Sequence, residues 1–165
     1  MPVQRLAVFL TTLLWTNLTG SLAVPILTLP HPPNPLLMKI ERLAGPYAKL
    51  VNKISLQEKV NPLLVAAVVN VENGNNFKGA NRRVSRTGAI GIMQLEPITA
   101  KQFQVNPWFP YQNILGGVRL LRYLLKRYHG KYRPTLEAYN AGPLHRRCPQ
   151  AVIYAALVLR RMKEC

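Results

Sequence analysis

The sequence of 165 residues contains no aspartate, and all six of its acidic residues are glutamates. This absence excludes EF-hand calcium loops, Ser-His-Asp triads and aspartate-held magnesium sites. Lys and Arg number 22, so the formal charge is +16. Such a surplus indicates a polyanionic partner, whether nucleic acid, an anionic membrane or an acidic wall polymer, or else only a solvated basic surface. The length fits one domain, and 48% hydrophobic residues exclude a charged disordered tail.

Cysteine is also scarce, with only Cys148 and Cys165. Export would allow a disulfide between them. However, a predicted helix over 151–162, about 18 Å long, holds the two thiols apart. We therefore do not expect a disulfide. Two lone cysteines without suitably spaced histidines make no zinc site, so no metal or cofactor is expected.

The one long apolar run preceded by a basic residue lies at the N-terminus. Arg5 precedes the apolar stretch Leu6–Leu14, and Ser21-Leu22-Ala23 offers small residues before a cut. This pattern predicts a signal peptide over 1–23 and export to the periplasm or cell envelope, with an uncleaved membrane anchor as the alternative. Five prolines follow, which predicts an extended linker over 24–35 and a folded domain over 36–165.

The remaining sequence reads as helices. Apolar residues recur at helical spacing over 36–43, 47–54 and 151–162, and short helices are expected over 98–103 and 134–141. Asn61-Pro62 is a typical helix start, and Glu72-Asn73-Gly74 a typical stop. A further helix is expected to begin at Asn113 as its cap and to end at Gly130. No strand run is convincing, so we expect a mostly α domain with little or no β-structure.

One acid lies in an unusual place. Glu72 directly follows the apolar run Val65–Val71, at the C-terminus of its helix. Desolvation and the helix dipole both raise the pKa of a carboxyl group there. A carboxylic acid still protonated near neutral pH suits acid-assisted glycosidic cleavage. Position alone, however, leaves a solvated glutamate as the more common case.

Five short motifs occur in a fixed order around this acid, and together they resemble the soluble lytic transglycosylase catalytic domain family. The motifs are Val71–Gly74, Ser85–Gln94, Pro97–Ala100, Gln112–Gly117 and Ala138–Pro143. The resemblance implies a lysozyme-like fold and cleavage of the glycan strand of peptidoglycan. Family members cut the β-1,4 bond between N-acetylmuramic acid and N-acetylglucosamine and leave 1,6-anhydromuramyl ends.

The resemblance also implies the site. Glu72 takes the place of the catalytic acid, and a single carboxyl group suffices because the substrate supplies the nucleophile, whereas hydrolysis usually needs a carboxylate pair. Tyr139 is expected to hydrogen-bond and orient this acid. Substrate-binding positions are expected at seven residues: Ser85, Met93, Gln94, Glu96, Thr99, Tyr139 and Asn140. Core packing remains an equal alternative for the Met93 side chain.

Two departures from the family pattern stand out. Asn73 replaces the serine that usually follows the catalytic glutamate. Glu96 replaces a methionine that commonly lines the cleft. A cleft-facing Glu96 would raise the pKa of Glu72 and could position a water molecule, which would favour a hydrolase; a solvated Glu96 at a helix start is the alternative.

Three functions follow from the sequence. The first is an exported, monomeric lytic transglycosylase that acts on peptidoglycan, in the service of a secretion or conjugation apparatus. The alternatives are a lysozyme-type hydrolase of the same bond and a non-catalytic cationic module that binds the wall. A nucleic-acid partner is not expected, because no binding motif accompanies the charge.

Overall fold

The computed structural model describes residues 34–164. The predicted signal peptide, the linker as far as residue 33 and Cys165 lie outside the described residues. Within the described part the α-helices are α1 (Pro35–Ala44), α2 (Ala48–Gln57), α3 (Pro62–Asn73), α4 (Pro97–Gln102), α5 (Pro110–Arg127), α6 (Tyr132–His145) and α7 (Pro149–Lys163). Two 3-10 turns, Gly45–Tyr47 and Ala80–Arg82, connect them. Residues 34–164 contain isolated bridges but no strand, so the mostly α prediction is confirmed.

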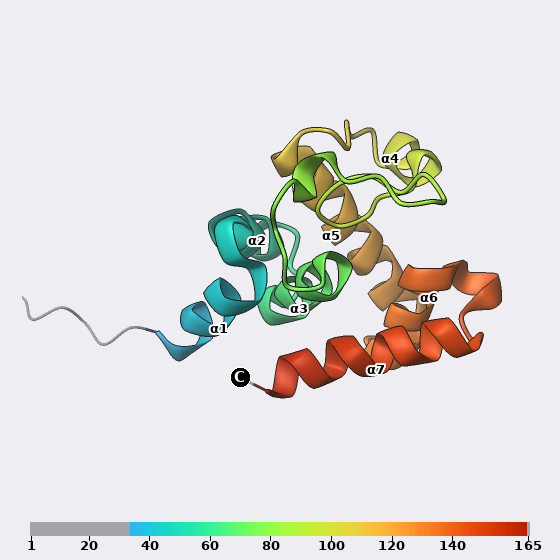
Figure 1. Ribbon diagram of the computed structural model, residues 1–165. Coiled ribbons are helices and arrows are strands. Elements are labelled where there is room, and N and C mark those ends of the chain that lie inside the picture. The colour runs from blue at the N-terminus through green and yellow to red at the C-terminus, as the bar shows by residue number, and fades with distance from the viewer. Residues whose placement is uncertain (1–33, 165) are drawn as a thin grey trace, which may run out of the picture. The chain divides into compact units, whose positions relative to one another are not determined.

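Helix α3 is the centre of the fold. It packs against α1, α2 and α7, and Figure 1 shows it between the N-terminal helices and α7. Six consecutive residues, 64–69, are fully buried, because this helix is apolar on all sides. The polar end of such a helix must therefore emerge from the core, and Glu72 lies there.

The ends of α3 follow the predicted cap chemistry. The Asn61 side chain accepts a hydrogen bond of 2.9 Å from Leu63 N, and Pro62 occupies the first turn. Gly74 ends the helix in the left-handed conformation, with φ 55°. Because both ends are fixed locally, the position of Glu72 in the last turn is fixed as well.

Several predicted helix boundaries are wrong by two or three residues. Helix α5 begins at Pro110 rather than at Asn113, and the Asn113 side chain is buried instead of capping. It accepts from Met93 N at 2.8 Å and donates to the carbonyls of Ile90 and Pro107. Helix α6 begins at Tyr132, and its break falls at Gly142, with φ 77° and ψ 161°, as the sequence indicated.

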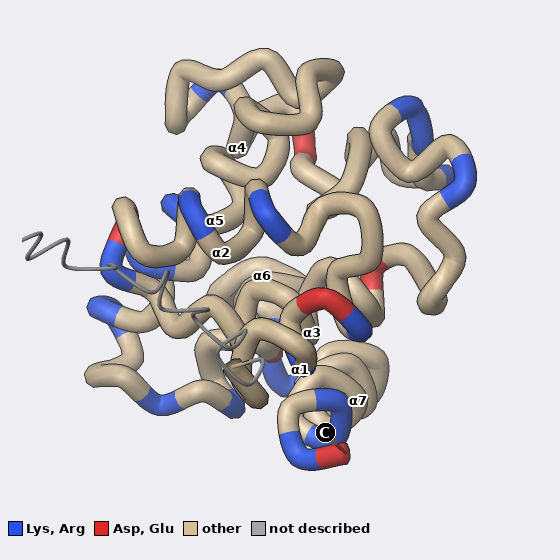
Figure 2. Tube along the Cα trace, turned by 90° about the vertical axis from the view of Figure 1, so that its left-hand side faces the viewer, with Lys and Arg blue, Asp and Glu red and all other residues tan. Residues whose placement is uncertain are grey.

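Basic side chains cover much of the described surface. Figure 2 shows Lys and Arg on helices and loops alike, with few acids between them. Of residues 1–33 and 165, Arg5 alone is charged, so residues 34–164 carry +15. None of the helices in the described residues is long and apolar enough to cross a membrane.

Candidate active site

Glu72 is held by a tyrosine from the other end of the chain. Glu72 is partly buried in the last turn of α3, and Tyr154 of α7 donates a hydrogen bond of 2.6 Å to its Oε1. Burial raises the pKa of Glu72 to about 7, and the hydrogen bond from Tyr154 partly opposes that rise. The carboxyl group is therefore about half protonated at neutral pH.

A second tyrosine lies against the first. The rings of Tyr139 and Tyr154 are stacked, with centroids 6.4 Å apart and planes 12° from parallel. The Tyr139 hydroxyl donates to the Met93 carbonyl at 2.8 Å, so the expected hydrogen bond from Tyr139 to the acid is made by Tyr154 instead. Burial and the nearby Glu72 hold both tyrosine pKa values well above their usual range. Both rings remain neutral, and Tyr154 acts as the hydrogen-bond donor.

The other buried acids are paired with arginine. Glu58 accepts from Arg119 at 3.0 Å and also pairs with Arg122, and Glu137 pairs with Arg146 at 3.3 Å. The Glu58 pairs join the end of α2 to α5, and the Glu137 pair links α6 to its own C-terminal cap residue. The ion pairs within residues 34–164 leave out Glu72, which has a neutral partner only. This difference distinguishes Glu72 from the two buried glutamates that are paired with arginine.

The second motif forms a tight loop. Ser85 Oγ accepts from the backbone N–H groups of Thr87 and Ala89, at 3.2 and 3.0 Å, and so closes a turn. The Met93 side chain is fully buried, which agrees with its core alternative. Gln94, at φ 48°, donates from its amide to the Gly91 carbonyl at 2.8 Å. All three residues shape the loop in this structure.

Four of the predicted substrate-binding residues lie together. Glu96, Thr99, Tyr139 and Asn140 line one groove of about 500 Å³, between α4, α5 and α6. The groove mixes polar groups with aromatic and aliphatic side chains, as small-molecule binding sites commonly do. Ser85, Met93 and Gln94 are not among its lining residues.

Glu96 is thus in the groove rather than fully in solvent. It precedes Pro97 at the start of α4, and one of its oxygens accepts from Thr87 Oγ1 at 3.2 Å. The pKa of Glu72 is raised by burial, however, and not by a charge on Glu96. The expected electrostatic coupling between the two acids is therefore not a cause of the raised pKa.

The sequence motifs gave no indication of the contacts that hold the C-terminal end of α3 in place. Asn73 Nδ2 donates to the carbonyls of Val69 and Ile92, at 2.8 and 2.7 Å, and its Oδ1 accepts from Arg83 at 3.0 Å. Asn73 therefore links the helix that carries Glu72 to the loop that carries Met93. Its departure from the family pattern was visible in the sequence, but its partners were not.

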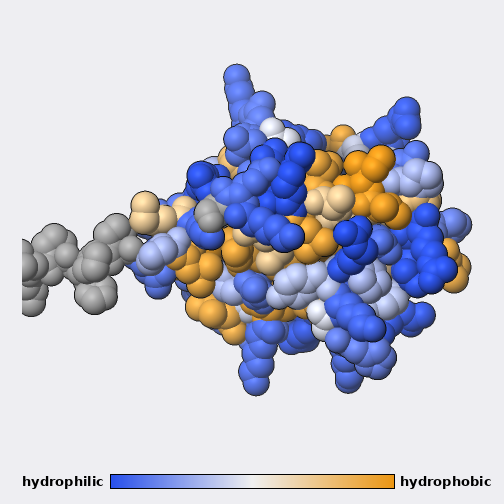
Figure 3. Space-filling model, turned by 90° about the horizontal axis from the view of Figure 1, so that it is seen from below, coloured by the Kyte–Doolittle hydropathy of each residue, from blue (hydrophilic) through white to orange (hydrophobic). Residues whose placement is uncertain are grey.

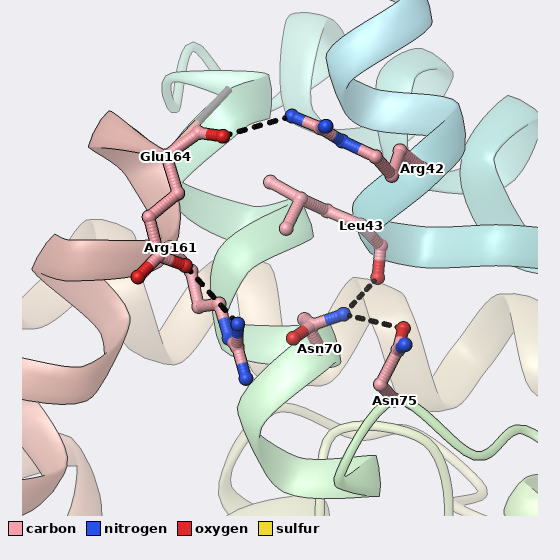
Figure 4. A pocket seen from close by; sticks show the side chains of 6 residues that line it. All are labelled: Arg42, Leu43, Asn70, Asn75, Arg161 and Glu164. Atoms are coloured by element: carbon pink, nitrogen blue, oxygen red, sulfur yellow. Dashed lines mark hydrogen bonds and ion pairs between the residues drawn. The ribbon is translucent and has the colours of Figure 1, made fainter.

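A second, smaller pocket of about 180 Å³ lies where α1, α3 and α7 meet (Figure 4). Arg42 donates to the Glu164 carbonyl at 3.1 Å, and Asn70 donates to the Leu43 carbonyl and to Asn75 Oδ1, both at 3.0 Å. The Arg42 bond fastens the end of α7 to α1, and the bond from Asn70 to the Leu43 carbonyl fastens α3 to α1. The Arg42 bond therefore holds the helix that supplies Tyr154.

The described residues contain no group of three side chains suited to a metal ion. The protein is thus an α-helical domain with one partly buried carboxyl group, that of Glu72, whose hydrogen-bond partner is the neutral Tyr154. A polar groove lies beside the neighbouring Tyr139. The sequence matches the Transglycosylase SLT domain family over residues 49–153, and the chain belongs to this family.

Known relatives agree with this assignment. A 93-residue stretch is 44% identical to a "Transglycosylase" of Enterobacteria phage PRD1, covering 56% of this chain and 33% of the phage protein. The fold resembles the lytic transglycosylase Slt of Pseudomonas aeruginosa, solved as an inactive Glu-to-Gln mutant, with a TM-score of 0.63 at 19% identity. It also resembles the 70 kDa soluble lytic transglycosylase of Escherichia coli, with a TM-score of 0.62 at 21% identity.

The matched regions define how far the likeness extends. The two solved structures cover 73% and 75% of this chain, respectively, and this chain covers 24% of each of them. The chain therefore spans a third or less of the length of these relatives. The structural likeness confirms the expected lysozyme-like fold.

Proposed function

We propose that the protein is a peptidoglycan lytic transglycosylase in which Glu72 is both the acid and the base. One observation carries the proposal: Glu72 has a pKa of about 7, while the other buried glutamates are paired with arginine. A group with this pKa can give a proton and take one back at neutral pH.

The proposed reaction has two proton transfers. Protonated Glu72 gives its proton to the oxygen of the glycosidic bond between N-acetylmuramic acid and N-acetylglucosamine, and that bond breaks. The resulting carboxylate takes the proton of the muramyl 6-hydroxyl, whose oxygen bonds to the anomeric carbon. The product is a 1,6-anhydromuramyl end, no water is consumed, and Glu72 is protonated again.

The environment of Glu72 suits both steps. Burial favours the protonated form that begins the reaction, and the Tyr154 hydrogen bond stabilises the carboxylate that forms midway. The groove lined by Thr99 and Asn140 offers hydroxyl and amide groups to sugar substituents. These features support a mechanism in which one carboxyl group is both acid and base, whereas a hydrolase usually needs two carboxyl groups.

Replacing Glu72 by Gln tests the proposal, with Glu41→Gln as the matched control. Glu41 is exposed on α1, away from the groove. Purified peptidoglycan is digested with each protein, and its ends are identified by mass spectrometry. We expect anhydromuramyl ends from the wild type and from Glu41→Gln, and none from Glu72→Gln. The Pseudomonas relative is inactive after a Glu-to-Gln replacement, which supports this choice of variant.

The same digest separates the alternatives. Reducing ends without anhydro ends would indicate a lysozyme-type hydrolase and contradict the proposal. Wall clearing that survives in Glu72→Gln would indicate a cationic binding module. Circular dichroism of Glu72→Gln shows whether a loss of activity comes from chemistry or from unfolding.

We further propose that the protein is exported, acts as a monomer and opens the wall locally for a secretion or conjugation apparatus. The apolar run at Leu6–Leu14 supports export, and a charge of +15 on residues 34–164 supports attraction to a wall polymer that bears carboxylates. Sequencing the N-terminus of the mature protein tests export. An intact Met1 would contradict cleavage of a signal peptide.

A further inference from the structure

The outer face of α7 is apolar in its middle and basic at its rim. Its inner face, Ala151, Tyr154, Ala155 and Val158, is buried. The opposite side exposes Ile153, and the shallow groove of about 210 Å³ beside it is lined by Ile153, Ala156, Leu157 and Arg160. This second stripe follows the same helical spacing as the core stripe, although nothing in residues 34–164 covers it.

A second groove runs along the other flank of α7. It has a volume of about 410 Å³, and it is lined by Arg133, Ala156, Leu159, Arg160 and Lys163. No acid lines either groove. The acid near this end of the helix, Glu164, is already paired with Arg160 and Arg161. The surface therefore presents apolar side chains between cations.

Helix α1 continues this surface. It exposes Leu36, Leu37 and Met38, and a groove of about 420 Å³ there is lined by Pro35, Met38, Lys39 and Arg42. The hydrogen bond from Arg42 to the Glu164 carbonyl joins α1 to the end of α7. Figure 3 shows the molecule from below, with apolar patches between strongly hydrophilic ones.

We propose that this α1–α7 surface binds an anionic lipid membrane, with Ile153 entering the headgroup region and Arg133, Arg160 and Lys163 contacting lipid phosphates. Peripheral helices bind membranes through this combination of apolar and basic side chains. A flat, anionic layer meets both helices at once. A second copy of the chain is disfavoured, because each copy carries +15 over residues 34–164.

The position of α1 in the chain supports the same occupant. The segment before it contains the apolar run Leu6–Leu14, which the sequence predicts to enter the membrane during export or to anchor there. A membrane-facing α1–α7 surface would keep the enzyme at the lipid side of the wall.

Co-sedimentation of the full chain with lipid vesicles tests the proposal. One set contains phosphatidylglycerol and phosphatidylcholine in equal parts, and the other contains phosphatidylcholine alone. We expect tight binding to the anionic set, weakened by salt because part of the attraction is screened. The N-terminal segment is the same in all variants, and its own contribution would appear with the neutral vesicles as well.

Matched variants make the test specific to α7. Ile153→Glu removes an apolar side chain that is 59% exposed on α7, and Leu56→Glu does the same at a residue 62% exposed on α2. Arg133→Glu with Lys163→Glu reverses two rim charges. Lys49→Glu with Lys53→Glu reverses two exposed charges on α2, whose packing partners do not include α7.

We expect Ile153→Glu and the double variant Arg133→Glu with Lys163→Glu to bind anionic vesicles at least about tenfold more weakly, and the α2 variants to bind like the wild type. If the two double charge reversals weaken vesicle binding equally, the attraction comes from total charge, and the proposal is overturned. If the wild type does not bind anionic vesicles at all, the proposal is also overturned, and an acidic protein is left as the partner. It is likewise overturned if the wild type is a dimer that Ile153→Glu dissociates. Glu72→Gln should bind vesicles normally, so this test is independent of the catalytic one.

Discussion

The hydroxyl of Tyr154 donates a hydrogen bond of 2.6 Å to Glu72 Oε1 across 82 residues of sequence. The bond joins α7 to the last turn of α3. Among the hydrogen bonds between side chains of residues 34–164, it is the one that Glu72 makes, so it fixes where the acid points. The chemistry of Glu72 therefore depends on a helix outside the motifs that identify the family.

Tyr154→Phe should lower activity and move its pH dependence. The hydrogen bond lowers the pKa of Glu72, so its loss should raise that pKa further above about 7. The activity that is lost as Glu72 deprotonates should then persist to higher pH. A lost hydrogen bond to a charged group should cost about 10- to 100-fold in rate. The measurement is a pH–rate profile of peptidoglycan clearing.

Tyr139→Phe is the matched control for that experiment. Its hydroxyl donates to the Met93 carbonyl, not to Glu72. The pH at which activity is lost as Glu72 deprotonates, the alkaline limb of the profile, should therefore be the same as in the wild type. A limb that moves to lower pH in Tyr154→Phe would contradict the assigned role. So would an equal shift in both variants.

The raised pKa of Glu72 should also make stability depend on pH. The unfolded chain has a pKa near 4.5 at this residue and the native state about 7, so the native state binds more protons between these values. Its contribution is therefore complete below pH 4.5 and is lost as the pH rises through 7. The loss is about 3 kcal/mol.

Urea unfolding of the wild type and of Glu72→Gln, at pH 5 and pH 8, measures this contribution. The wild type should lose stability between the two values relative to Glu72→Gln, because glutamine carries no proton to lose. Parallel changes in the two proteins would show that Glu72 ionises as freely in the native state as in the unfolded chain.

Asn73→Ala should lower the unfolding free energy while leaving the Glu72 side chain itself unchanged. The change removes hydrogen bonds to the Val69 and Ile92 carbonyls and to Arg83. We expect a loss of about 1–3 kcal/mol in unfolding free energy, because buried groups lose their partners. Asn52→Ala, in the middle of α2, is the control and should cause no loss. Equal unfolding curves for Asn73→Ala and the wild type would contradict the structural role of Asn73.

The sequence predicted well wherever the cause is local. The cap at Asn61 and the stop at Gly74 depend on neighbouring residues, so the bounds of α3 and the place of Glu72 could be predicted from the chain itself. The raised pKa of Glu72 also followed, because the apolar run before it ensures burial. Glu96 and Asn140, two positions where substrate binding was expected, line the same groove.

Contacts across the fold could not be predicted in this way. Tyr154 reaches Glu72 only because α7 packs on α3, and no motif covers that pair. The wrong start of α5 has a similar cause: Asn113 can cap a helix, but here Pro110 begins the helix and the amide of Asn113 holds the loop around Met93. The spacing of Ala151, Tyr154, Ala155 and Val158 could have marked Tyr154 as buried, though not its partner.

Glu96→Gln should leave the type of product unchanged. Glu96 lies in the groove and accepts from Thr87, but the raised pKa of Glu72 has burial as its cause. Glu72 can therefore supply acid and base without a second carboxylate. Wild type and Glu96→Gln should both give anhydromuramyl ends in the mass spectrum, with rates within about tenfold, since one neutral hydrogen bond replaces a charged one.

The digest would show a different role for Glu96 directly. A water molecule positioned by Glu96 would compete with the muramyl 6-hydroxyl for the anomeric carbon, and the wild type would then give reducing ends. Those ends should disappear in Glu96→Gln if the carboxylate activates that water molecule. Digestion in ¹⁸O-labelled water makes the distinction quantitative, because a hydrolysed end carries the label and an anhydro end formed within the sugar does not.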